Sequence, residues 1–372
     1  MKCMYRKAML LVVGFMSTLI CSYADVESAV WANWDEKIRE YEGEANNESP
    51  VYVSHVLTNS VGLAVADFDN DGDLDYATIS GDRILVYDGS SNGESAIWYS
   101  KDLGVGSVDL IDGDFDGDGN IEIAVLGARV RVWEPATQSN GATETWYSES
   151  KTDPIAGMAT GDFDGDGKLE VAVGLGSRPR TYEPATQASN AGPLWYGKSF
   201  VAANMGAITA GDYDGDGNID LAVCADDRIR VFEPKTQASD ASAYWYSING
   251  NGVVTAMTSG DFDGDGNMEF AISGADRVRV FEPATQVSGS AQYWYSKAYA
   301  GNATAMDSGD LDGDGMLDII FAVDGRIRAC EPGSQASNAA EWYYSDNRTP
   351  NPSSIVYVST YFAPVGTLIV IK

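Results

Sequence analysis

The sequence predicts an all-β protein that folds as a seven-bladed β-propeller of four-stranded antiparallel blades; a six-bladed ring is the alternative. Three observations support this prediction. A nine-residue acidic pattern occurs six times, at intervals of 47, 48, 50, 49 and 49 residues, and a nearly constant period of this size indicates a repeat architecture. Each repeat contains four strand-like runs, and the fourth run carries an aromatic pair. Four strands in about fifty residues are typical of a propeller blade.

The N-terminus has the features of a secretory signal peptide over residues 1–24. Basic residues precede an apolar run at residues 8–20, and Ala24 is a small residue at the point where a signal peptidase would cleave. A lipoprotein signal at Cys21 fits less well, because bulky residues stand directly before it. The sequence therefore predicts a secreted, periplasmic or cell-surface protein.

The segment between the signal and the repeats is predicted to be an N-terminal helix and a linker over residues 25–50. The propeller is then expected to span residues 51–372. The segment is acidic, and its apolar residues have the spacing of one helix face. These residues are Val26, Val30, Trp34, Ile38 and Tyr41.

The fifth repeat illustrates the four strand-like runs. The acidic pattern joins the first run to the second, a tight turn joins the second to the third, and a Glu-Pro segment leads to the fourth. Such a meander places the acidic loops and the Glu-Pro segments on one rim of the ring. The runs are residues 254–259, 268–273, 277–281 and 292–296.

The acidic pattern has the chemistry of a calcium loop, as residues 162–170 (DFDGDGKLE) show. Carboxylates at positions 1, 3 and 5 converge only where the chain curls tightly, and the glycine at position 6 permits that curl because it accepts a positive φ. Position 7 offers its backbone carbonyl, so its side chain is free to vary, while position 9 is always acidic. Such a set of oxygen ligands suits Ca²⁺ better than Mg²⁺ or Zn²⁺.

The six patterns, called loops 1 to 6, predict about six calcium sites. A single match to a loop motif can arise by chance, but six matches in register are hard to explain as solvated acidic turns. The predicted ligands, at positions 1, 3, 5, 7 and 9 of loops 1 to 6 in turn, are Asp67, Asp69, Asp71, Asp73, Asp75; Asp114, Asp116, Asp118, Asn120, Glu122; Asp162, Asp164, Asp166, Lys168, Glu170; Asp212, Asp214, Asp216, Asn218, Asp220; Asp261, Asp263, Asp265, Asn267, Glu269; and Asp310, Asp312, Asp314, Met316, Asp318.

An aromatic pair also recurs with the period. A row of aromatic rings can form a sugar-stacking platform, but a tryptophan at the same place in every blade is more often a wedge between blades. We expect the wedge. The pairs are Trp98-Tyr99, Trp146-Tyr147, Trp195-Tyr196, Trp245-Tyr246, Trp294-Tyr295 and Trp342-Tyr343.

The two ends of the repeat region predict how the ring closes. Repeat 6 already has its fourth strand, yet strand-like runs continue at residues 355–360 and 367–371. Residues 51–54 precede loop 1 at the place where a fourth strand is expected. Together these pieces predict a seventh, metal-free blade that pairs the two termini and removes exposed sheet edges.

An arginine follows the first aspartate of each loop by 15 or 16 residues, at the turn between the second and third strands. The six are predicted to form a circle of cations on the rim opposite the loops. The favoured interpretation is pairing with acidic neighbours such as Asp82, Asp227 and Asp276. The alternative is a site for an anionic ligand, such as an acidic polysaccharide or a carboxylate side chain. The arginines are Arg83, Arg129, Arg178, Arg228, Arg277 and Arg326.

Composition limits the possible partners. The 372 residues are 44% hydrophobic and 11% aromatic, which is enough for a large core. The formal net charge is −31, and six calcium ions would reduce it to −19, which argues against nucleic acid or an anionic membrane as the main partner. We expect a monomer without a membrane span. Cys224 and Cys330 are expected to be buried and unpaired, and His55 to lie at a surface or edge.

The loops resemble those of a known family. Asp-Phe-Asp-Gly-Asp-Gly segments, each opening a strand such as residues 169–173, are similar to FG-GAP-like or VCBS repeats, which are related to the propeller of integrin α chains. The resemblance covers about residues 55–345. It implies a calcium-binding propeller of the kind found in secreted adhesive or ligand-binding proteins, with some members attached to enzymes. The Phe-Gly and Gly-Ala-Pro signatures are missing, so integrin-type ligand recognition is not implied.

Three classes of function remain. A binding or adhesion module for an extracellular glycan or protein leads, because the recurring chemistry is metal ligation and packing. A calcium-dependent polysaccharide-active enzyme would need a non-repeating acid-base cluster, and none stands out in the sequence; we therefore expect no enzyme and no catalytic residues. A purely structural cell-surface module is the third class.

Overall fold

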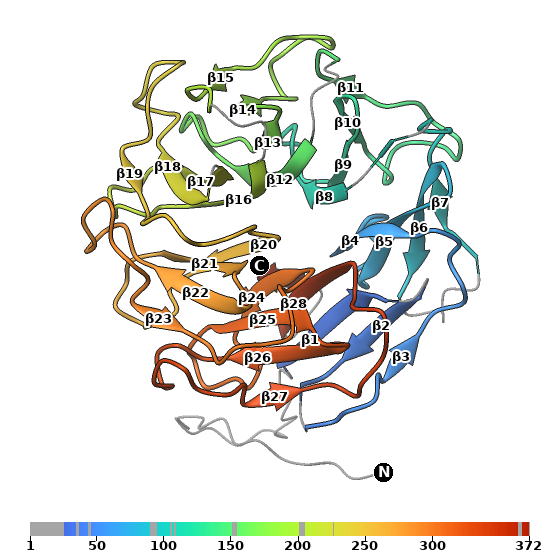
Figure 1. Cartoon of the computed structure of the whole chain (residues 1–372). Helices are drawn as coiled ribbons and strands as arrows, with labels where there is room; N and C mark the ends of the chain where they lie inside the picture. Colours follow the sequence, from blue (N-terminus) through green and yellow to red (C-terminus); the bar gives the residue numbers. More distant parts are fainter. Residues whose placement is uncertain are drawn as a thin grey trace, which may run out of the picture.

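The computed structural model describes residues 26–34, 37–43, 46–89, 95–104, 106–107, 109–150, 155–200, 205–225, 227–363 and 367–371. All of its regular elements are β-strands, and they form seven antiparallel sheets. Figure 1 shows the sheets arranged around a central axis as the blades of a propeller. The predicted seven-bladed fold is therefore confirmed, and the six-bladed alternative is wrong. The predicted signal peptide at 1–24 lies outside the described residues.

Six blades are meanders of four consecutive strands, and we number them by their order in the chain. Blade 1 contains β4 (Val61–Ala66), β5 (Asp75–Ser80), β6 (Arg83–Asp88) and β7 (Trp98–Tyr99). Blade 2 contains β8 (Asp109–Gly113), β9 (Glu122–Leu126), β10 (Val130–Trp133) and β11 (Trp146–Tyr147). Blade 3 contains β12 (Ile155–Gly161), β13 (Glu170–Leu175), β14 (Arg178–Tyr182) and β15 (Trp195–Tyr196).

The remaining meanders repeat the arrangement. Blade 4 contains β16 (Met205–Gly211), β17 (Asp220–Ala225), β18 (Arg228–Phe232) and β19 (Trp245–Tyr246). Blade 5 contains β20 (Ala256–Gly260), β21 (Glu269–Gly274), β22 (Arg277–Phe281) and β23 (Trp294–Tyr295). Blade 6 contains β24 (Met306–Gly309), β25 (Asp318–Val323), β26 (Arg326–Cys330) and β27 (Tyr343–Tyr344). The first strands of neighbouring blades lie side by side, so they form the inner wall.

The second strand of each blade is buried on both faces, because each sheet lies between two others. In β21, Phe270 and Ile272 pack into one core cluster with residues of blade 4, whereas Ala271 packs into another with residues of blade 6. Since alternate side chains of a strand point to opposite faces, both sets must be apolar. This explains why the sequences of these strands are uninterrupted runs of apolar residues.

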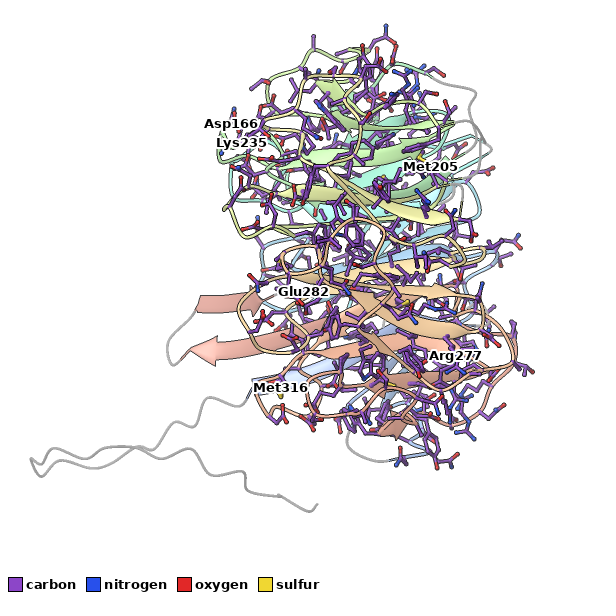
Figure 2. The ribbon with its side chains drawn as sticks, turned by 60° about the vertical axis from the view of Figure 1, so that its left-hand side comes forward. Asp166, Met205, Lys235, Arg277, Glu282 and Met316 are labelled. Atoms are coloured by element: carbon purple, nitrogen blue, oxygen red, sulfur yellow. The ribbon has the colours of Figure 1, made fainter. Side chains whose placement is uncertain are left out.

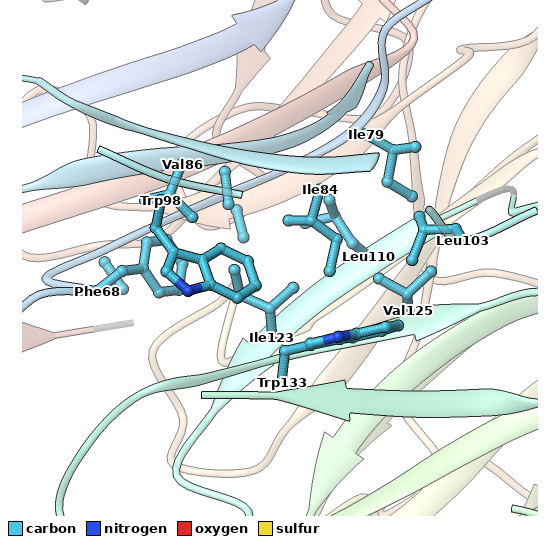
Figure 3. Close-up of a cluster of buried hydrophobic side chains, with 13 residues drawn as sticks. Phe68, Ile79, Ile84, Val86, Trp98, Leu103, Leu110, Ile123, Val125 and Trp133 are labelled. Carbon is cyan, nitrogen blue, oxygen red and sulfur yellow. The ribbon is translucent and has the colours of Figure 1, made fainter. Parts of the chain in front are cut away.

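The tryptophan of the aromatic pair is a wedge between blades, as predicted. Five of these rings are only 3–5% exposed, and each Nε1 donates a hydrogen bond of 2.8–3.0 Å to a glutamine carbonyl oxygen in the Glu-Pro segment of the next blade. Figure 3 shows one such interface, where Trp98 of β7 packs with residues of β6 and β9. The tryptophans are Trp98, Trp146, Trp195, Trp245 and Trp294.

The predicted aromatic pair of blade 6 is shifted by one residue. The short outer strand β27 begins at Tyr343, and this ring takes the wedge position with 1% exposure. Trp342 instead donates from Nε1 to Asp318 Oδ1 at 2.6 Å. Because three aromatic residues follow one another, the sequence does not show which two of them form the outer strand. The pairing of β26 with β27, in which Arg328 lies opposite Tyr344, settles this register.

Blade 7 closes the ring with strands from both ends of the chain. Its inner strand is β28 (Ser354–Ala363), followed by β1 (Val26–Asn33), β2 (Ile38–Tyr41) and β3 (Tyr52–Val53). The closing pair is antiparallel and includes Val30 opposite Tyr357. The prediction that the termini pair in a seventh blade is confirmed.

The predicted N-terminal helix at 25–50 is wrong, because this segment supplies β1 and β2. The spacing was ambiguous: apolar residues four apart lie on one face of a helix and also on one face of a strand. The propeller therefore begins with β1, and the predicted boundary at residue 51 is incorrect. The pairing with β28, more than 300 residues away, decides between the two conformations.

Strand β29 (Thr367–Ile371) is a fifth strand of the blade 7 sheet, so the prediction that placed its residues in this blade is confirmed. It pairs with the distal part of β28, on the side of β28 away from β1. Figure 2 shows this hairpin extending beyond the disc, on the side where Asp166 and Lys235 are labelled.

The remaining fold predictions concern the cysteines and the membrane. Cys224 and Cys330 are buried and are not joined to each other in a disulfide, as predicted. Within the described ranges, no helix has the length and apolar character needed to cross a membrane.

Candidate metal centres

Each acidic loop connects the inner strand of its blade to the second strand. In loop 3, Asp162 Oδ1 accepts hydrogen bonds from the backbone N–H groups of Gly165 (2.7 Å) and Asp166 (3.0 Å). Its Oδ2 accepts one from Gly167 at 2.9 Å. The two glycines have φ angles of 78° and 93°, which residues with a side chain rarely adopt. The aspartate at position 1 thus holds the curled backbone around its own carboxylate.

The position 9 side chains lie beneath the loops with 0–2% exposure. One carboxylate oxygen of each accepts the backbone N–H of position 2, at 2.5–3.0 Å. Burial, together with the nearby aspartates, raises the pKa of all six carboxyl groups to about 8. The six are Asp75, Glu122, Glu170, Asp220, Glu269 and Asp318.

In four of the loops, the second oxygen of the position 9 carboxylate is buried and has no hydrogen-bond partner among the described residues. These atoms are Glu122 Oε1, Glu170 Oε1, Asp220 Oδ1 and Glu269 Oε1. Leaving such an oxygen unsatisfied is costly, and a bound cation would satisfy it. The residues present therefore fit a hard metal ion.

The predicted ligands at positions 1, 3, 5 and 9 converge. One oxygen each from Asp114, Asp116, Asp118 and Glu122 lies within 4.8 Å of the others, and the same holds for these positions in loops 3 and 5. In loops 1 and 4 the converging residues are those at positions 1, 3 and 9. In loop 6, the backbone N–H groups of Asp314 and Gly315 donate to Asp310, and that of Asp314 also donates to Asp312.

Two of the side chains at position 7 make other hydrogen bonds. In loops 2 and 4, Asn120 and Asn218 each donate from Nδ2 to the position 5 aspartate and to a glutamate further along the chain. The backbone carbonyl of position 7 stays the predicted ligand at this position. The predicted position 7 residues are Asp73, Asn120, Lys168, Asn218, Asn267 and Met316.

Sequence reasoning missed the glutamate of the Glu-Pro segment as a neighbour of the loop. Asn120 Nδ2 lies 2.7 Å from Glu134 Oε1, and Asn218 Nδ2 lies 2.9 Å from Glu233 Oε1. The recurrence of this glutamate was visible in the sequence, and placing both segments on one rim could have suggested the contact.

Two further residues contact the position 9 carboxylates. Tyr244 donates from its hydroxyl to Asp220 Oδ2 at 2.6 Å. Trp342 donates from Nε1 to Asp318 Oδ1, also at 2.6 Å. Both precede an outer strand, and nothing in the repeat pattern pointed to them. They would orient a metal ligand without contacting the ion.

The six predicted ligand arginines stack on the tyrosines of the outer strands. The guanidinium carbon lies 4.8–5.4 Å from the ring centroid in all six blades. Figure 2 shows Arg277 on the side of the disc opposite Asp166, as predicted for that rim. The pairs are Arg83 with Tyr99, Arg129 with Tyr147, Arg178 with Tyr196, Arg228 with Tyr246, Arg277 with Tyr295 and Arg326 with Tyr344.

Several of these arginines also contact the next blade. Arg178 Nη1 lies 3.5 Å from Asp240 Oδ1. Arg277 donates from Nη1 to Asn338 Oδ1 at 2.9 Å. The predicted partner Asp227 instead accepts the backbone N–H groups of Gly250 and Gly252. The arginines therefore help to hold neighbouring blades together. The local sequence indicated only partners in the same turn and not these residues of the next blade.

Comparison with known proteins agrees with this geometry. Residues 114–173, 212–272 and 261–321 match the FG-GAP-like repeat. One solved structure with a similar fold is the crystal structure of BBS1N in complex with ARL6DN, soaked with mercury; it shares 11% identity and a TM-score of 0.57, over 83% of this chain and 90% of the other. At that identity the likeness concerns the fold alone. No curated protein matches the chain.

Proposed function

Because the chain is a seven-bladed propeller built with FG-GAP-like repeats, we propose that it is a calcium-stabilised binding module whose ligand is an extracellular glycan or protein. The observation that carries the calcium part is the set of four buried position 9 oxygens that have no hydrogen-bond partner in the described part of the chain. They occur at the same place in successive blades, so a single structural accident does not explain them.

Calcium is the metal that fits this donor set best. Three aspartates and one further carboxylate approach one point in the best-formed loops, and their mutual repulsion needs a cation. The donors are oxygens, which hard cations prefer over softer metals. Backbone carbonyl ligands and a flexible loop suit the irregular coordination of Ca²⁺ better than the strict octahedron of Mg²⁺.

The arginine rim is the surface that we propose for an anionic ligand. Each arginine presents a cation on top of a tyrosine ring, and the pair recurs in six blades. Arg83 and Arg178 have side chains that are 44% and 28% exposed, so their donors are accessible from solvent. An acidic polysaccharide could contact several blades at once, which raises its affinity through multivalency.

We propose no catalytic role. The recurring carboxylates belong to the loops and to the Glu-Pro segments beside them, which assigns them to metal binding and packing. The secretory leader predicted at 1–24 would deliver the chain to a compartment where calcium fills even weak sites.

A binding screen in calcium tests this proposal. Arrayed glycans and candidate proteins would be tested with the wild type and with the double variant Arg228→Ala/Arg277→Ala. We expect an acidic ligand to bind the wild type and to bind the variant about tenfold more weakly or worse, because two bidentate contacts are lost. The melting temperature in calcium should fall by only a few degrees, because the variant loses the stacking on two tyrosines and the contact of Arg277 with Asn338 but keeps the fold.

A matched variant, Arg228→Lys/Arg277→Lys, keeps the charge and removes the planar guanidinium. Intermediate binding is expected from it. If the alanine variant binds equally well, or if its stability collapses, the arginines are structural and the ligand site lies elsewhere. Cleavage of a glycan chain would favour an enzyme instead.

A further inference from the structure

The Glu-Pro segment of one blade lies against the acidic loop of the preceding blade. A Cβ atom built on Gly165 of loop 3 would collide with Lys235 Nζ of blade 4. A Cβ atom built on Gly333 of blade 6 would lie 3.0 Å from the Phe262 carbonyl oxygen and 3.4 Å from the Asp263 Cα of loop 5. Both contacts come from the residue directly after Glu-Pro, so the arrangement repeats between blades.

Lys235 is the only lysine at this position of the five Glu-Pro segments. The equivalent residues are alanine in blades 2, 3 and 5, and glycine in blade 6. The lysine therefore gives loop 3 an ammonium group that the Glu-Pro segments do not give to the other loops. Figure 2 labels Lys235 next to Asp166 of that loop.

A second lysine belongs to loop 3 itself. Lys168 occupies position 7, where three of the other loops have asparagine. Its Nζ lies 4.0 Å from Asp166 Oδ2, and the two side chains are 35% and 40% exposed. Loop 3 thus has four carboxylates and two ammonium groups, whereas loop 4 has four carboxylates and a neutral asparagine at position 7.

We infer that loop 3 is the weakest of the six calcium sites and empties first as free calcium falls. The inference rests on the proposed calcium binding. Affinity in such loops is set largely by the charge around the ion. An ammonium group about 7 Å from a divalent cation at a wet surface weakens binding by about tenfold, and two groups weaken it further.

The lysines also explain how blade 3 tolerates the loss of its ion. When calcium leaves, the ammonium groups remain beside the aspartates and reduce their mutual repulsion. Loops with neutral neighbours have no such compensation. One blade can therefore respond to a change in calcium that leaves the other five loops filled.

Equilibrium dialysis of the full chain against calcium buffers tests this inference, with bound calcium counted per chain. We expect five ions to bind at lower free calcium and a sixth to need about tenfold more or higher. Lys235→Ala, which restores the residue of three other blades, should shift the last step about tenfold toward lower calcium. In the double variant Lys235→Ala/Lys168→Asn, the last ion should bind in the same range of free calcium as the other five.

Two controls assign the weak step. Lys198→Ala removes the same charge from an exposed lysine whose Nζ lies 3.4 Å from Ser242 Oγ, and it should leave the titration unchanged. Asp164→Ala should remove the weak step and leave the five tight ions. Six equivalent ions in the wild type, or loss of a tight ion in Asp164→Ala, would overturn the inference. Absence of any bound calcium would instead overturn the proposed function.

Discussion

In four of the loops, the two oxygens of the position 9 carboxylate have different roles. In blade 5, Glu269 accepts the backbone N–H of Phe262 with one oxygen, which anchors the loop, and its other oxygen is buried without a partner among the described residues. The hydrogen bond from the Phe262 N–H holds the loop in place whether or not a metal is bound. The second oxygen is costly to bury unless a cation binds it.

Glu269→Gln should separate these two tasks. The amide oxygen can still accept the N–H of Phe262, but the ligand charge is lost. We expect one fewer bound calcium ion and lower stability in calcium. In chelator the same variant should be more stable than the wild type, by about 1–2 kcal/mol, because an isolated buried carboxylate has been removed. Thermal melts in both conditions measure this.

Glu144→Gln is the matched control for Glu269→Gln, because Glu144 is partly exposed and lies outside the loops, between the Glu-Pro segment and the outer strand of blade 2. It should leave both melting temperatures unchanged. A Glu269→Gln protein that still binds six calcium ions would contradict the assigned role of this carboxylate.

The Asp109 carboxyl group, which lies outside the acidic loops, should make the stability of the fold depend on pH. Burial raises the pKa of this carboxyl group to about 6, while the backbone N–H of Leu110 donates to it. The folded pKa lies above the unfolded value of about 3.9, so the folded state binds the proton more tightly. Stability is therefore lost as pH rises through the window from about 4 to about 6.

Asp109→Asn should remove this dependence. At pH 7 the variant should be more stable than the wild type by about 1–2 kcal/mol, and at about pH 4 the two should be nearly equal. Urea unfolding at the two pH values measures the difference. A variant that is equally destabilised at both values would show that the carboxylate makes a favourable contact instead.

At the scale of single elements, the wedge tryptophans connect each outer strand to the next blade. Trp245 is 3% exposed and donates to the Gln286 carbonyl oxygen of blade 5. Trp245→Ala should therefore destabilise the protein by about 3–5 kcal/mol, through the cavity and the unpaired carbonyl. Chemical denaturation measures this cost.

The neighbouring residue provides the comparison for Trp245→Ala. Tyr246 is 39% exposed, so Tyr246→Ala should cost less than about 1.5 kcal/mol, mainly through its stacking with Arg228. Equal costs for the two variants would mean that the ring of Trp245 is not the wedge.

The elements differ in how far the sequence predicts them. The second strands are continuous apolar runs bounded by a metal loop and a turn, so their type and place follow from local chemistry. Strand β1 does not follow in this way, because Val26, Val30 and Trp34 fit both periods and the partner strand is at the far end of the chain. The convergence of the loop carboxylates was predictable from their spacing, whereas the contacts of Lys235 and Trp342 depend on how blades stack.

At the scale of the whole molecule, stability depends on ring closure. Strand β28 lies beside the inner strands of blades 6 and 1 and pairs with β1. Deletion of residues 354–372 should therefore remove the closing strand and expose sheet edges that aggregate. We expect loss of the monomer in size-exclusion chromatography and a much broader melt.

Deletion of residues 367–372 is the matched truncation, because it removes β29 and leaves the pairing of β28 with β1. This shorter truncation should remain a folded monomer. If the longer deletion also yields a cooperative monomer, blade 7 is not required to close the ring.

We propose that calcium bound in the loops stabilises the whole propeller. A ligand that binds only the folded state raises stability by mass action, and six sites add their contributions. The most direct measurement is the melting temperature of the wild type in millimolar calcium and in excess chelator, each at the same ionic strength. We expect a melting temperature that is higher by about ten degrees or more in calcium, on the basis of about 1 kcal/mol or more per site. Superimposable melting curves would contradict it.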